Sequence, residues 1–246
     1  MKRHSSAFRT LGLGIAGAVA AAAMSTGAAI AVPTTGTAGT AVTPAQYIAY
    51  LEGQNSPEAL EVLAEFKALA PDEQSKFVGY LNDPEVFKAF LEYSGESQGQ
   101  NATASTTGEK RVTKYNQDVI FVNEGNVTRE RSGATRDVTW TEKATYTFKQ
   151  KLLGVTVTKM TVWVRYSASR GAVEKALNSG SALKNFNIGV DIDGDNARPW
   201  VSGGRAHAET VWKGELTYSG YTARIDKIQH LSAAWDGTWK GSTKNA

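Results

Sequence analysis

Three aspartates alternate along one short segment, at Asp191, Asp193 and Asp195 in the sequence DIDGDN. Carboxylate oxygens are the ligands that hard cations prefer, and Gly194 permits the tight turn that would direct them to one point. The spacing differs from that of an EF-hand loop, which places Gly after the third acidic position. The segment therefore predicts either a Ca²⁺ site or a polar turn, in which Asp, Gly and Asn are ordinary residues.

A second set of reactive side chains begins at His207 and Glu209, which alternate along a β-like segment and so share one face of a strand. Together with His230, Asp191 and Asp193, they would supply acid–base or metal-assisted hydrolysis if the fold gathered them into one cleft. The spacing alone does not require such a cleft. The alternative is an exposed His/Glu pair on a strand face.

Several classes of chemistry find no support in the sequence. The chain has no cysteine, which excludes thiolate metal sites and cysteine nucleophiles. It has no G-x-S-x-G motif, no phosphate-binding P-loop and no dinucleotide-binding glycine pattern. We therefore expect binding rather than catalysis, and we assign no catalytic residue.

Basic residues alternate with aromatic residues in the middle of the chain. Arg129, Arg131 and Arg136 lie close in sequence to Trp140 and Tyr146. Such a mixture favours an anionic polymer as partner, and in an exported protein a wall polymer is expected rather than nucleic acid. The alternative is a solvated strand face.

Tryptophans are concentrated towards the C-terminus, where exposed rings would stack on sugars or contact a protein. Trp200 follows Pro199 in a polar stretch and is the first candidate for exposure, followed by Trp235 and Trp239. We expect Trp163 and Trp212 to be buried.

The elements that must position these residues fall into two regions. Beyond residue 110, apolar and polar residues alternate with a period of two, as in half-buried antiparallel strands. This basic β domain, 110–246, is predicted to be a mainly antiparallel β-sandwich or small barrel with one short helix at 169–180. The expected strands are 118–123, 135–148, 155–166, 186–192, 207–218, 221–230 and 234–240.

The region before it, 43–94, reads as a helical module. Pro44, Pro57, Pro71 and Pro84 each stand where a first helical residue would stand, and apolar residues follow at helical spacing. Four short helices predict a small bundle of marginal stability. Residues 95–109, rich in Ser, Gly and Thr, predict a flexible linker.

The N-terminus predicts export. Residues 1–31 combine Lys2, Arg3 and Arg9 with an apolar stretch too short to span a membrane and a small-residue cleavage pattern. Residues 32–42 are predicted to be disordered. We expect a secreted, extracellular protein of the bacterial exoprotein type, without stable membrane insertion.

Charge is divided between the two regions. Residues 32–100 carry ten Asp/Glu and three Lys, whereas residues 101–246 carry fourteen Asp/Glu and twenty-one Lys/Arg, so their net charges are −7 and +7. The prediction is a secreted, non-enzymatic binding protein whose basic β domain engages an extracellular protein or an anionic wall polymer. The acidic helices would dock on the β domain as a pro-region. The alternatives are an extracellular hydrolase and a polysaccharide-binding wall module.

Overall fold

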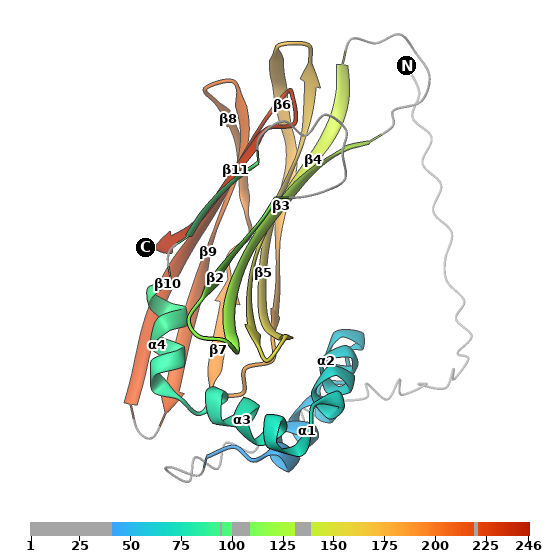
Figure 1. The fold of residues 1–246 in the computed structure, drawn as a ribbon. Helices are drawn as coiled ribbons and strands as arrows, with labels where there is room; N and C mark the ends of the chain where they lie inside the picture. The colour runs from blue at the N-terminus through green and yellow to red at the C-terminus, as the bar shows by residue number, and fades with distance from the viewer. Residues whose placement is uncertain (1–40, 94, 100–108, 131–138, 219–220) are drawn as a thin grey trace, which may run out of the picture. The chain divides into compact units, whose positions relative to one another are not determined.

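The computed structural model describes residues 41–93, 95–99, 109–130, 139–218 and 221–246 (Figure 1). The chain divides into two units, Met1–Gly36 and Thr37–Ala246, and all the described residues belong to the second. The predicted signal peptide 1–31 lies outside the described residues. So do residues 32–40 of the predicted disordered segment and residues 100–108 of the predicted linker.

Helices form where the proline pattern predicts them. They are α1 (Pro44–Gly53), α2 (Pro57–Ala68), α3 (Pro71–Leu81) and α4 (Pro84–Glu92). Proline suits the first helical position because its missing N–H has no helical partner there. Ser56 Oγ accepts a hydrogen bond from Ala59 N at 3.1 Å, and Asp83 Oδ1 accepts one from Glu85 N at 2.9 Å. These caps satisfy free amide groups at the two helix starts. None of the helices in the described residues has the length and apolar character needed to cross a bilayer.

The strands form two antiparallel sheets. In the first sheet the order is β1-β11-β10-β9-β7, with β8 also paired to β9, and in the second it is β2-β3-β4-β5-β6. The predicted antiparallel β body is therefore confirmed. The strands are β1 (Gly95–Gly99), β2 (Glu109–Lys114), β3 (Val119–Glu130), β4 (Thr139–Leu152), β5 (Val155–Ser169), β6 (Ala172–Asn185), β7 (Val190–Gly194), β8 (Arg198–Ser202), β9 (Arg205–Tyr218), β10 (Tyr221–Ala234) and β11 (Trp239–Asn245).

The facing sides of the two sheets share one apolar cluster. Tyr146 and Tyr166 from the second sheet pack with Leu231 and Trp239 from the first, and all four are almost completely buried. The tip of the Trp239 indole lies over Gly125, where an added Cβ would come within 2.5 Å of the ring. The absence of a side chain at Gly125 thus makes room for the indole between the sheets.

A second apolar cluster joins the helices to one end of the sheets (Figure 1). Tyr47 and Phe66 from the helices and Phe121 and Phe148 from the strands are among its buried members. The Tyr47 hydroxyl also donates a hydrogen bond to the carbonyl oxygen of Phe186 at 3.1 Å. The helices and this end of the β body therefore share one core.

The helix predicted at 169–180 is wrong, because most of that segment belongs to β6 and pairs with β5. Val173 and Ala176 both pack into the apolar cluster between the sheets, although they stand three positions apart, as on one face of a helix. A strand achieves this spacing through one extra residue, Glu174, at a shift in register. Pairing with β5 has overridden the local helical pattern.

The predicted linker 95–109 also differs from the structure at its first residues. Gly95–Gly99 form β1, which pairs antiparallel with β11 from Gly95 opposite Thr243 to Gly99 opposite Trp239. A Ser/Gly-rich composition predicts a linker when no partner strand is known. Here the edge of β11 supplies the missing hydrogen-bond partners.

Candidate functional site

Three lysines form a row across the second sheet. Lys149 on β4 lies opposite Lys159 on β5, which in turn lies opposite Lys184 on β6. Like charges directly opposite one another destabilise a sheet. The lysine row, as we call Lys149, Lys159 and Lys184, therefore requires anions nearby, from the protein or from a ligand.

The hairpin between β4 and β5 determines this register. Its turn residues, Leu153 and Gly154, have φ values of 48° and 87°, as a tight two-residue hairpin turn requires. The register then shifts by one residue, because Lys151 faces Thr156 but Gln150 faces Thr158. Without this shift, Lys149 would face Thr158 instead of Lys159.

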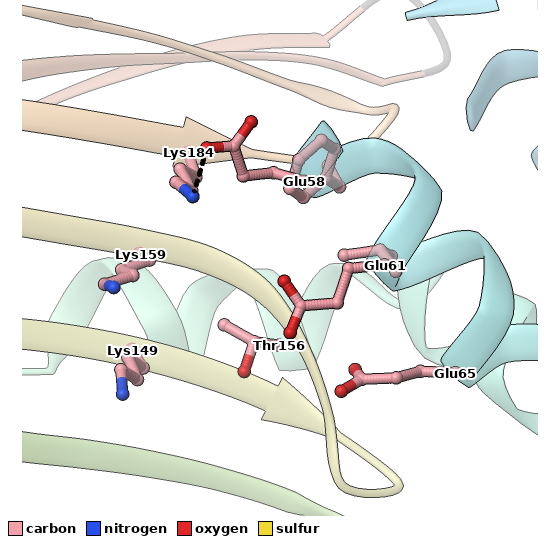
Figure 2. Close-up of a pocket in the computed structure, with 9 residues that line it drawn as sticks. Glu58, Glu61, Glu65, Lys149, Thr156, Lys159 and Lys184 are labelled. Carbon is pink, nitrogen blue, oxygen red and sulfur yellow. Dashed lines mark hydrogen bonds and ion pairs between the residues drawn. The ribbon is translucent and has the colours of Figure 1, made fainter. Parts of the chain in front are cut away.

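The anions come from one side of α2. Glu58, Glu61 and Glu65 are spaced by three and four residues, so they lie along one helix face. Figure 2 shows their carboxylates projecting from α2 towards the lysine row. Glu58 Oε1 lies 2.6 Å from Lys184 Nζ, and this hydrogen bond holds the pKa of Glu58 below its usual range. We call these three residues the glutamate stripe.

A pocket of about 170 Å³ separates the glutamate stripe from the lysine row. Val62 and Phe186 provide its apolar lining, and Thr156 adds a hydroxyl group. Figure 2 shows the charged groups on opposite walls of this pocket. The pocket therefore offers ammonium groups on one wall and carboxylates on the other.

Lys159 is the least compensated member of the lysine row. Lys149 forms an ion pair with Glu124, and Lys184 forms one with Glu58. Among the residues the structure describes, no ion pair is formed by Lys159, which is half-buried. Burial, followed by repulsion from Lys149 and Lys184, lowers the pKa of Lys159. An anionic group entering the pocket would relieve this repulsion.

The three aspartates predicted to bind Ca²⁺ are not gathered into one site. Asp191 and Asp193 are exposed on β7, and Asp195 follows this strand and forms an ion pair with Lys213 at 3.0 Å. Within the described ranges, no group of three or more His, Asp or Glu residues could hold a metal ion. Asp191 and Asp193 belong to β7 and pair with β9, so the alternative of a polar turn does not describe them either.

The residues predicted to form a hydrolase site lie far apart. Asp193 faces Lys213 on β9, whereas His207 is six positions away along the same strand, or about 20 Å. His207 and Glu209 instead lie on β9 beside His230 of β10, which is directly opposite Glu209. The pKa of His230 is lowered by burial and by His207. The geometry therefore gives no cleft for the proposed hydrolysis.

The three candidate tryptophans have different environments. Trp200 on β8 is 36% exposed and stacks on His207, with ring centroids 4.9 Å apart. Trp235 is half-buried against the cluster between the sheets. Trp239 is only 2% exposed, so its predicted exposure is wrong. It is buried because Gly125 on the facing sheet leaves room for the indole.

Two further tryptophans were expected to be buried. Trp212 is buried, whereas Trp163 is only half-buried and lies over Gly180.

Arg129 is bound to a buried carboxylate. Its guanidinium donates to Glu142 Oε1 at 2.8 Å and lies over the Trp140 ring. Glu142 is 3% exposed and also accepts hydrogen bonds from Trp140 Nε1 and the Tyr166 hydroxyl. Arg129 therefore compensates a buried charge between the sheets. Arg131 and Arg136 lie outside the described residues.

The sequence reasoning missed Lys159, Lys184 and the glutamate stripe. The i, i+3, i+7 spacing of the glutamates was visible as one acidic helix face. The lysines come from three strands, so only the strand register brings them together. Comparison of the chain with protein-family models, curated proteins and solved structures gives no match.

Proposed function

We propose that the chain is a secreted, non-enzymatic binding protein that holds an anionic group of its partner against Lys159, in the pocket beneath α2. The observation that carries the proposal is the lysine row, in which half-buried Lys159 has no ion pair of its own among the described residues. An ammonium group screened from water attracts phosphate or carboxylate more strongly than an exposed one does.

The partner class follows from charge and from the expected export. An anionic wall polymer is the first candidate, because its repeated phosphates present many copies of the required group. An acidic extracellular protein is the second. The pocket, at about 170 Å³, admits one anionic group rather than an extended chain segment. The partner would therefore dock one group into the pocket and run over the surrounding surface.

In this proposal the helical module acts as a fixed cap on the β domain. Tyr47, Phe66 and Phe77 are fully buried in the shared core, and each contributes about 1.5–3 kcal/mol through burial. The ion pair between Glu58 and Lys184 is partly exposed, so water screens it and it contributes little to stability. Because the apolar contribution dominates, we expect the helices to stay in place when ligand binds. A pro-region released by proteolysis is the less favoured form of the hypothesis.

Binding of a glycerol-phosphate polymer to the chain 32–246 at low ionic strength tests the proposal. We expect Lys159→Gln to weaken binding about tenfold, as for the loss of one charge-assisted contact. Glu61→Gln should strengthen binding, because Glu61 lines the pocket and repels an entering anion. Lys175→Gln is the matched control, since Lys175 is an exposed lysine of the same sheet that does not line this pocket.

Equal losses in Lys159→Gln and Lys175→Gln would show that net charge alone drives binding and would contradict the proposed site. Poly-glutamate serves as a second probe. Tighter binding of poly-glutamate, with the same dependence on Lys159, would indicate an acidic protein as partner in place of the wall polymer.

A further inference from the structure

The outer face of the first sheet carries a pair of histidines in direct contact. His207 on β9 and His230 on β10 place Nδ1 and Nε2, respectively, 3.1 Å apart. The chain has three histidines, and the third, His4, lies in the predicted signal segment. Trp200 stacks over both rings, at centroid distances of 4.9 Å to His207 and 5.7 Å to His230. We call His207 and His230 the histidine pair.

The hydrogen bonds determine which nitrogen carries each proton. His207 Nε2 lies 3.0 Å from the carbonyl oxygen of Ser202, which can only accept, so this nitrogen carries the proton. In the neutral ring, His207 Nδ1 is then unprotonated and accepts from Nε2–H of His230. The lone pair of His207 therefore points at His230. A backbone carbonyl on the opposite nitrogen is also the usual support of a metal-binding histidine.

The separation between the two nitrogens matches that of two ligands on one metal ion. Imidazole nitrogens bind first-row metals at about 2.0–2.1 Å, so two of them at square to tetrahedral angles lie about 2.9–3.4 Å apart. The observed 3.1 Å falls in this interval. We propose that the histidine pair binds one divalent transition-metal ion through His207 Nδ1 and His230 Nε2.

The reaction is a simple ligand exchange. The ion lies to one side of the line between the two nitrogens, about 2.0–2.1 Å from each. It displaces the Nε2 proton of His230, which moves to Nδ1 of the same ring, so both imidazoles stay neutral. The described residues offer no group of three or more His, Asp or Glu ligands, so water completes the coordination sphere. Two imidazoles favour Cu²⁺ over Ni²⁺ and Zn²⁺. This site is independent of the pocket at Lys159.

Titration of the chain 32–246 with CuCl₂ in metal-free buffer tests the proposal, with tryptophan fluorescence as readout. We expect one ion per chain and quenching at micromolar Cu²⁺, because Trp200 lies against both ligands. Most of this quenching should be absent in Trp200→Phe, although the ion still binds by calorimetry. His207→Gln and His230→Gln should each weaken binding at least tenfold. Asp193→Asn, at an exposed acid on β7, should leave it unchanged.

A second measurement on the unaltered chain does not depend on any variant. Substoichiometric Cu²⁺ should broaden the NMR signals of both imidazole rings before those of other side chains. Binding that survives both histidine substitutions would overturn the proposal. So would a titration without saturable binding at one ion per chain, or broadening that first affects the aspartates of β7.

Discussion

At the scale of single residues, this protein buries the carboxylate of Glu142 and the ammonium group of Lys227 in different surroundings. Glu142 is 3% exposed but accepts hydrogen bonds from Arg129, Trp140 and Tyr166, so its charge is compensated. Lys227 is also 3% exposed, and its ammonium donates hydrogen bonds to the Tyr93 carbonyl and to Asn245 Oδ1. Burial lowers the pKa of Lys227 to about 8.

This shift predicts a pH dependence of stability. Below about pH 8 the folded and the unfolded chain both hold the Lys227 proton, and burial of this charged group disfavours the folded state. Between about pH 8 and 10.5 the folded state releases this proton while the unfolded state keeps it, so the free energy of unfolding rises with pH.

The measurement is urea unfolding of the wild type and Lys227→Met at pH 7.5 and 10.5. We expect the wild type to gain up to about 3 kcal/mol relative to the variant over this interval. Lys240→Met, at an exposed lysine, should follow the wild type. Parallel pH curves for the wild type and Lys227→Met would contradict the assignment.

Individual side chains also show where sequence reasoning fails. The exposure of Trp200 could be predicted from its polar surroundings in the sequence. The burial of Trp239 could not, because it depends on Gly125, which lies on the other sheet and far away in the sequence. Whether a large ring is buried depends on the residues that face it as well as on the sequence pattern of its own strand.

At the scale of elements, features determined by local interactions were predictable. Within the described residues, each helix from α1 to α4 begins at a proline, since capping and the fixed φ of proline act within a few residues. Strand β6 was not predictable, because β5 and a one-residue bulge at Glu174 outweigh its helical spacing. The contact between the two sheets is equally non-local.

Gly125→Ala tests that contact. The added methyl group would meet the Trp239 ring at 2.5 Å, so we expect a loss of about 1–3 kcal/mol in the free energy of unfolding. Gly53→Ala is the control, because nothing lies within 4 Å of a Cβ at that position. In a double-mutant cycle, Trp239→Phe should reduce the cost of Gly125→Ala. Additive effects would show that the two residues do not meet.

At the scale of the whole unit, Thr37–Ala246, the helices and the sheets share one core, so we expect them to unfold together. Phe66→Ala in α2 should lower the free energy of unfolding by about 3–5 kcal/mol, because Phe66 is completely buried. Circular dichroism and tryptophan fluorescence should still report one coincident transition.

Leu60→Ala on the same helix is the matched control, since Leu60 is 57% exposed and should change stability little. Two separate transitions, with the β signal unaffected by Phe66→Ala, would instead indicate independent modules. That outcome would restore the hypothesis of a detachable pro-region.

The acidic and the basic region of the sequence meet at the pocket between α2 and the second sheet. An acidic N-terminal region and a basic C-terminal region could be recognised from composition, but not the surface where the charges meet. That surface depends on the hairpin at Leu153 and Gly154 and on the register shift after it. Only the folded sheet therefore reveals the lysine row.

The most direct test of the account is the pKa of Lys159, measured by NMR of the lysine side chains with and without the glycerol-phosphate polymer. We predict that the Lys159 ammonium has a pKa below the usual range of lysine in the free protein, because burial and its lysine neighbours disfavour its charge. We predict that this pKa rises when the polymer binds. A Lys159 pKa in the usual lysine range that does not change when the polymer is added would contradict the central claim of an anion site at the lysine row.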